Sequence, residues 1–88
     1  MGAYENAANT SVSITLKYLK DRMDELGINQ SQLSNIIGVS KSTVKRWFDK
    51  DRDMSLTNYY KMCGALELRP YLIPKEDDDN EMEFIHFN

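Results

Sequence analysis

Hydrophobic and polar positions follow a helical period over most of the chain. In the first periodic stretch the apolar residues recur at three- and four-residue spacing: Leu16, Leu19, Met23 and Leu26. This spacing predicts an amphipathic helix that begins after a cap at Ser11 or Ser13 and ends at Gly27. The residues before it are small and polar, so we expect residues 1–12 to be disordered.

Two shorter helices are predicted on either side of Gly38. The side chain of Asn29 can cap the first helix, and Gly38 can end it in the left-handed conformation. Its apolar stripe consists of Leu33, Ile36 and Ile37. Ser40 can cap the second helix, in which we expect three apolar residues to face inward: Val44, Trp47 and Phe48. Two helices joined tightly through glycine, with a polar and basic outer face on the second, have the dimensions of a major-groove reader.

A fourth helix is predicted after the polar loop of residues 49–54. Ser55 can cap it, and its apolar stripe consists of Leu56, Tyr59, Met62, Cys63 and Leu66. Beyond this helix, Pro70 could begin a short fifth helix. Equally, residues 71–73 could be extended, because Pro74 disfavours the helical conformation at the residue before it.

The last residues favour a β-structure. Residues 82–87 are rich in strand formers and nearly alternate, so they could form a strand, or a hairpin with residues 71–75. The pattern therefore predicts a mainly α fold of four to five helices, with a C-terminal β-strand or hairpin as an open alternative.

The order of residues in the centre of the chain resembles the Cro/C1-type (XRE-like) helix-turn-helix family. The matching residues are Asn29, Gln30, Leu33, Ser34, Gly38, Val39, Ser40, Thr43, Val44 and Arg46, followed by Ser55, Leu56, Leu66 and Leu68. The resemblance covers about residues 14–73 and implies a DNA-binding domain over residues 13–73. Relatives often hold glycine and proline where this chain has Lys50 and Met54, which leaves the path of the loop open.

The charge distribution supports this interpretation, although the whole chain of 88 residues has a net charge of −3. All 11 lysines and arginines lie between Lys17 and Lys75, together with seven acids, which gives +4. Residues 76–88 hold six acids and no lysine or arginine, which gives −6. A basic body with an acidic tail over residues 74–88 is a recognised sign of nucleic-acid contact by one part of a chain.

The composition gives little support to other classes of function. The single cysteine, Cys63, cannot form an intramolecular disulfide, and with the single histidine, His86, it cannot build a zinc site. These two residues are predicted in a helix interior and a terminal strand, so we expect no enzyme, no cofactor and no metal. There is neither a secretory signal nor an apolar run of the roughly 20 residues that span a bilayer, so a cytoplasmic protein without a membrane partner is expected.

The outer face of the predicted helix over residues 41–48 supplies most of the candidate DNA contacts. The candidate residues are Gln30, Lys41, Ser42, Thr43, Lys45 and Arg46. Arg46 is the best candidate for a bidentate contact to guanine, and Lys41 is the second. Gln30 matches the family position that contacts a phosphate and can brace the start of the next helix. Thr43 and Lys45 could reach either the backbone or a base.

One short helix reads too few bases for tight specific binding, so we expect a homodimer on a palindromic operator of double-stranded DNA. The preferred function is a transcriptional regulator, in particular a repressor, with the tail either helping dimerisation or screening the basic helix. Two alternatives remain at this point. One is an antitoxin that binds a protein toxin through its C-terminal tail, and the other is an interaction module that does not bind DNA.

Overall fold

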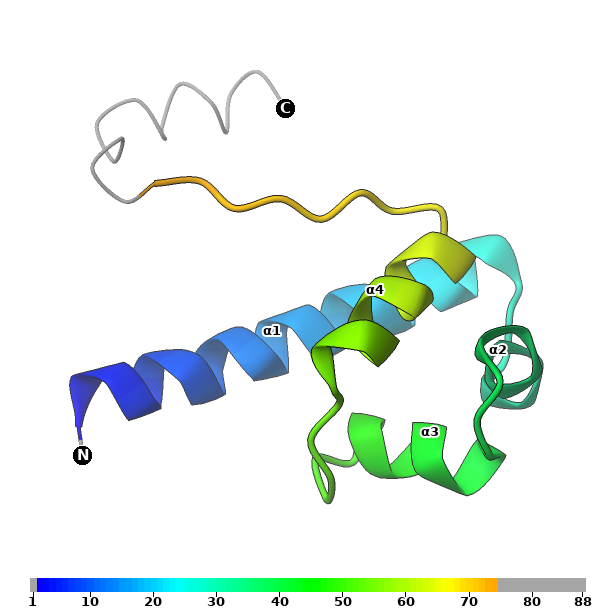
Figure 1. Ribbon diagram of the computed structural model, residues 1–88, viewed down its shortest axis with the longest axis horizontal. Helices are drawn as coiled ribbons and strands as arrows, with labels where there is room; N and C mark the ends of the chain where they lie inside the picture. Colours follow the sequence, from blue (N-terminus) through cyan, green and yellow to red (C-terminus); the bar gives the residue numbers. More distant parts are fainter. Residues whose placement is uncertain (1, 75–88) are drawn as a thin grey trace.

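A computed structural model describes residues 2–74 of the chain, so the predicted strand over residues 82–87 lies outside the described residues. The described residues form four helices and no strand: α1 (Ala3–Leu26), α2 (Gln30–Ile37), α3 (Lys41–Phe48) and α4 (Leu56–Ala65). The prediction of a mainly α fold is therefore confirmed. The fifth helix considered at Pro70 is not formed, because residues 68–74 continue without regular structure (Figure 1).

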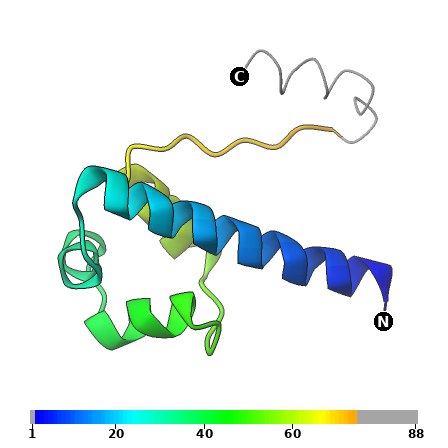
Figure 2. The same cartoon turned by 180° about the vertical axis from the view of Figure 1, so that it is seen from behind.

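The four helices enclose one small core. α4 lies beside the C-terminal half of α1, and α2 and α3 complete the domain on one side of this pair (Figures 1 and 2). Every helix contributes at least one buried apolar side chain to this core: Leu19, Met23, Leu33, Ile37, Val44, Trp47, Met62 and Leu66. The N-terminal half of α1 projects away from the core in both views.

Two of the predicted apolar stripes are wrong at one residue each. Ile36 is 58% exposed, and its expected inner place is taken by Ser34, which is 4% exposed. Ser34 can be buried because its hydroxyl donates a hydrogen bond of 2.7 Å to the backbone carbonyl of Ser31, which leaves no polar atom unpaired. Leu56 is 67% exposed, since it is the first residue of α4 and lies at the rim of the core.

Each of the four helices is followed, within two residues of its last residue, by a residue in the left-handed conformation. These residues are Gly27, Gly38, Lys50 and Glu67, with φ values of 70°, 81°, 64° and 60°. In each case the next N–H donates a hydrogen bond to the carbonyl five residues earlier: Ile28 to Met23, Val39 to Ser34, Asp51 to Arg46, and Leu68 to Cys63. This is the Schellman arrangement, which satisfies carbonyls at the helix end and reverses the chain.

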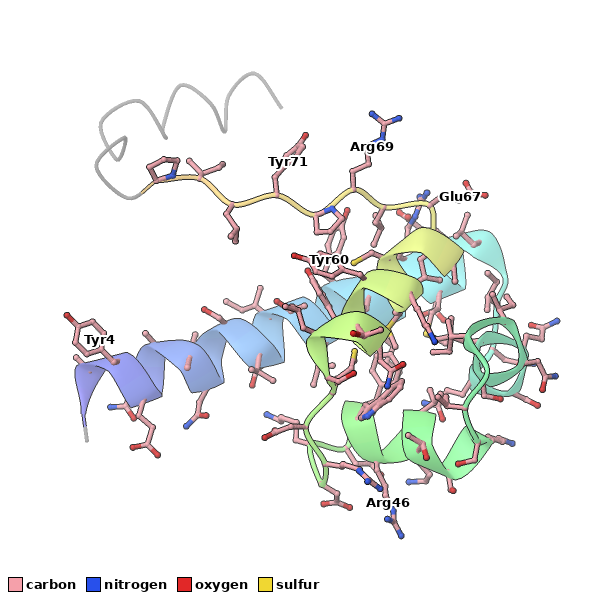
Figure 3. All side chains as sticks on the ribbon, in the orientation of Figure 1. Tyr4, Arg46, Tyr60, Glu67, Arg69 and Tyr71 are labelled. Carbon is pink, nitrogen blue, oxygen red and sulfur yellow. The ribbon has the colours of Figure 1, made fainter. Side chains whose placement is uncertain are left out.

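The first helix is longer than the sequence analysis predicts. α1 begins at Ala3, so the expected disorder of residues 3–12 is wrong and no cap at Ser11 or Ser13 is used. Three alanines and Glu5 favour the helical conformation in this stretch, and elongation of a helix already anchored by Leu19 and Met23 needs no new nucleus. Tyr4 nevertheless projects into solvent with 94% of its surface exposed (Figure 3).

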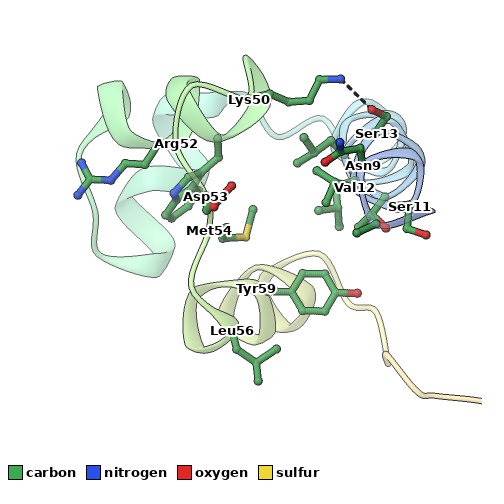
Figure 4. Close-up of a pocket in the computed structure, with 15 residues that line it drawn as sticks. Asn9, Ser11, Val12, Ser13, Lys50, Arg52, Asp53, Met54, Leu56 and Tyr59 are labelled. Carbon is green, nitrogen blue, oxygen red and sulfur yellow. Dashed lines mark hydrogen bonds between the residues drawn. The ribbon is translucent and has the colours of Figure 1, made fainter. Parts of the chain in front are cut away.

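The loop after α3 follows the path that glycine would allow, although a lysine occupies the position. The Lys50 Nζ donates a hydrogen bond of 2.7 Å to the Ser13 hydroxyl and so joins the loop to α1 (Figure 4). A groove of about 920 Å³ lies beneath this contact, between α1, the loop and the start of α4. Lys50 at positive φ therefore settles the path that the sequence left open, and its side chain makes a contact with α1 that glycine could not make.

We predict that Lys50→Gly stabilises the domain. A left-handed conformation costs an L-residue about 1–2 kcal/mol, and glycine avoids this cost. Part of this gain is offset, because glycine loses more conformational entropy on folding than lysine does. The net gain in the free energy of unfolding should be about 0.5–1 kcal/mol, because the lost contact to Ser13 is exposed. Urea unfolding measures it. Lys50→Ala is the matched control, since it keeps the strain and loses the contact, and equal stability of the two variants would contradict the prediction.

Candidate nucleic-acid interface

Both ends of α2 are fixed by hydrogen bonds that the local sequence supplies. The side chain of Asn29 accepts from the Gln32 N–H at 2.8 Å, while the Gln32 side chain accepts from the Asn29 N–H at 2.9 Å. This reciprocal pair is a capping box, which defines where α2 begins. Gly38 ends α2 two turns later, and its N–H donates to the Ser34 carbonyl at 2.9 Å.

The underside of α3 is held by the core. Ser40 caps this helix, and its hydroxyl accepts from the Thr43 N–H at 3.1 Å. Val44 and Trp47 are buried at 0% and 3% exposure, and Phe48 is half-buried against the same core. Because one side of α3 is fixed in this way, the side chains on its other side face solvent.

Four of the six candidate residues lie exposed on α3: Lys41, Ser42, Lys45 and Arg46. Arg46 projects from the outer side of the helix, away from the rest of the molecule (Figure 3). The other two, Thr43 and Gln30, are half-buried. The Thr43 hydroxyl lies 2.8 Å from the Ser40 hydroxyl and shares a hydrogen bond with it, so its first partner is the cap of its own helix. Gln30 is the first residue of α2 and stands apart from the α3 set.

Lys45 is engaged by a residue that the sequence analysis did not single out. Its Nζ lies 2.6 Å from the Asp49 carboxylate, one helical turn further along. The hydrogen bond and the charge of Asp49 raise the pKa of Lys45 above its ordinary value of 10.5, with a smaller contribution from the charge of Asp51. The four-residue spacing of lysine and aspartate is the signal that could have indicated this pair.

Lys41 and Arg46 form no ion pair with any residue between 2 and 74. α3 contains three cations and no acid, whereas the loop that follows it carries three aspartates, Asp49, Asp51 and Asp53, and only two cations, Lys50 and Arg52. The positive charge is therefore concentrated on the exposed side of the helix. A lysine and an arginine that are solvated and unpaired in this way can meet phosphate oxygens or the two acceptors of guanine.

The comparison with known families identifies this arrangement. The sequence matches the family model described as helix-turn-helix over residues 19–73. The chain belongs to the helix-turn-helix family of the Cro/C1 type. No curated protein and no solved structure gives a match to the chain. The family assignment makes residues 19–73 a DNA-binding domain and not an enzyme, and it confirms the resemblance on which the candidate residues rest.

Two further findings concern the described residues only. Between residues 2 and 74 no three histidine, cysteine, aspartate or glutamate side chains come together as a metal ion would require. None of the four helices has both the length and the apolar character that crossing a membrane demands.

We predict that Asp49→Asn lowers the pKa of Lys45 toward 10.5, because the carboxylate is the main cause of its rise. A raised pKa means that the ion pair is present at neutral pH and is lost as the pH rises through the pKa of the folded state. An NMR titration of the Lys45 side chain measures the change. Asp51→Asn is the control and should lower the pKa less. An unchanged Lys45 pKa in Asp49→Asn would show that the pair does not form in solution.

Proposed function

We propose that this protein is a sequence-specific transcriptional regulator, in particular a repressor, that reads the major groove of double-stranded DNA with α3. The observation that supports the proposal most directly is the division of α3 into two sides. Val44 and Trp47 anchor one side in the core, and Lys41 and Arg46 stand unpaired, among residues 2–74, on the other. The family assignment of residues 19–73 supports a DNA-binding role for this helix pair.

The proposed contacts differ in what they contribute. Arg46 donates two hydrogen bonds to the O6 and N7 atoms of one guanine, and Lys41 reaches a second acceptor from the first turn of α3. Lys45 is held by Asp49, so we assign it to a phosphate of the DNA backbone, where a point charge is sufficient. Gln30 at the start of α2 is assigned to a phosphate as well, and Ser42 and Thr43 add weaker contacts near the cap.

Two copies of the chain act together in this proposal. One helix of eight residues buries too little surface for a tight and specific complex. Two copies related by a two-fold axis place their recognition helices about 34 Å apart, one turn of DNA, and the operator then has the same symmetry.

We predict that Arg46→Ala weakens specific binding by about 1–3 kcal/mol and relaxes the preference at one base pair. The loss follows from removal of both hydrogen bonds to guanine. Fluorescence anisotropy with the operator and with single-base variants measures both effects. Lys61→Ala is the control, because Lys61 is exposed on α4 and outside the proposed interface. An Arg46→Ala variant with unchanged affinity and specificity would remove Arg46 from the base-reading role.

Selection of bound duplexes from a random pool tests the proposal as a whole. We predict a palindromic sequence with half-sites about one helical turn apart, because the recognition helices are related by two-fold symmetry. Binding to it should fall steeply with salt, since lysine and arginine release counterions from the phosphates. Failure to enrich any duplex at low salt would contradict the proposal, and an asymmetric sequence would contradict the two-fold arrangement.

A further inference from the structure

An apolar stripe runs along the exposed side of α1. Its members recur at alternating three- and four-residue spacing: Tyr4, Ala7, Ser11, Ile14 and Tyr18. All five are exposed, and the three large ones keep 94%, 64% and 59% of their surface in water. This spacing is the heptad pattern of a helix that packs against another helix. The two tyrosines at its ends are placed symmetrically, because Tyr4 and Tyr18 each lie seven residues from Ser11.

The N-terminal half of α1 lacks the support that a helix of its length needs. The family match begins at residue 19, so residues 3–18 precede the conserved domain pattern. Residues 3–12 are all exposed, and the Ser13 contact with Lys50 is the only side-chain hydrogen bond that joins residues 3–18 to a described residue outside α1. Isolated helical stretches this short are marginal in water. A partner helix along the stripe would supply the missing packing.

A hollow lies at the other end of the stripe. It has a volume of about 300 Å³ and is bounded on the α1 side by Ile14 and Tyr18, and on the other side by Leu68, Arg69 and Pro70. In an antiparallel pair of α1 helices centred on Ser11, Tyr4 of one copy lies opposite Tyr18 of the other, which is where this hollow opens. An exposed aromatic side chain at one end of the stripe thus corresponds to a recess at the other.

We propose that α1 pairs with α1 of a second copy of this chain, antiparallel and centred on Ser11. Each Tyr4 then enters the hollow beside Tyr18 of the other copy, and Ala7 lies within one residue of the level of Ile14 of the other copy, about 1.5 Å along the helix axis, a small residue beside a large one. Tyr4 to Tyr18 spans about 21 Å at 1.5 Å per residue, so the contact is shorter than a standard interface and the dimer depends on concentration.

Charge and position both permit this pairing. Glu5 is the only charged side chain between residues 2 and 16, and it lies outside the stripe, so two copies do not repel each other along it. Tyr4 projects from the side of α1 that faces away from α3, and Arg46 projects from the opposite side of the molecule (Figure 3). The pairing therefore leaves α3 exposed but directs the two α3 helices to opposite sides, so it is a contact separate from the two-fold arrangement that we propose on DNA. The pairing goes beyond the proposed DNA binding and does not depend on it, because it uses no residue of α2 or α3.

Sedimentation of the full chain without DNA tests the proposal. The wild-type protein should show a monomer–dimer equilibrium, and Ala7→Glu and Ile14→Lys should each raise its dissociation constant at least about tenfold, because each puts an unpaired charge into the contact. The double variant should regain most of the affinity, since antiparallel pairing places the new glutamate beside the new lysine of the other copy. The matched control is Asn6→Glu, which adds the same charge one residue away and off the stripe, and should leave the dissociation constant unchanged.

Three results would overturn the proposal. The first is a wild-type protein that stays monomeric at all concentrations tested. The second is a dimer that neither single α1 variant weakens, particularly if Phe84→Ser abolishes it, since the tail would then form the contact. The third is a double variant no better than the two single variants, which would exclude the antiparallel arrangement. Circular dichroism verifies that each variant keeps its helices, and failure of DNA binding alone would leave the pairing intact.

Discussion

The fold depends on four chain reversals, each made by one residue at positive φ. In a small domain with short connections, a helix can pack against the next one only if the chain turns back at once. The left-handed residue achieves this, and the N–H after it pairs with the carbonyl five residues earlier. At three of the four reversals the residue that follows is apolar and returns to the core: Ile28, Val39 and Leu68. The same geometry therefore ends a helix, satisfies its carbonyls and directs the chain inward.

Half of these reversals could be predicted from the sequence. The reversals at Gly27 and Gly38 are predictable, because glycine is the one residue that adopts positive φ without strain. Lys50 and Glu67 do not, since an L-residue is held there only by the surrounding hydrogen bonds, which exist once the fold has formed. The start of α1 differs from the prediction for a related reason. Small polar residues indicate disorder when taken alone, whereas a helix already anchored in the core extends through them.

In the candidate interface, too, some features follow from the sequence pattern and others depend on contacts that exist only in the folded structure. Helical periodicity was sufficient to place Lys41, Lys45 and Arg46 outside and Val44 and Trp47 inside. The four-residue spacing of Lys45 and Asp49 indicates that these two can pair, but only the folded structure shows that the Asp49 carboxylate lies 2.6 Å from the Lys45 Nζ. Periodicity could not place Ser34 inside the core instead of Ile36, since the deciding hydrogen bond belongs to the folded turn. Composition and period predict which face is exposed, and the folded contacts decide which exposed groups are engaged.

α3 and the N-terminal half of α1 differ in how much apolar surface they leave exposed. α3 is two turns long and would not be stable alone, so its direction is set by the side chains it buries, and no large apolar residue of α3 remains exposed. The direction in which Arg46 points is therefore set by the packing of the buried side of α3. α1 has the reverse arrangement, because its C-terminal half is anchored and its N-terminal half leaves Tyr4, Ile14 and Tyr18 in water. The exposed cations of α3 need no further packing before they meet DNA. Exposed tyrosine and isoleucine side chains, in contrast, gain stability only when another apolar surface covers them.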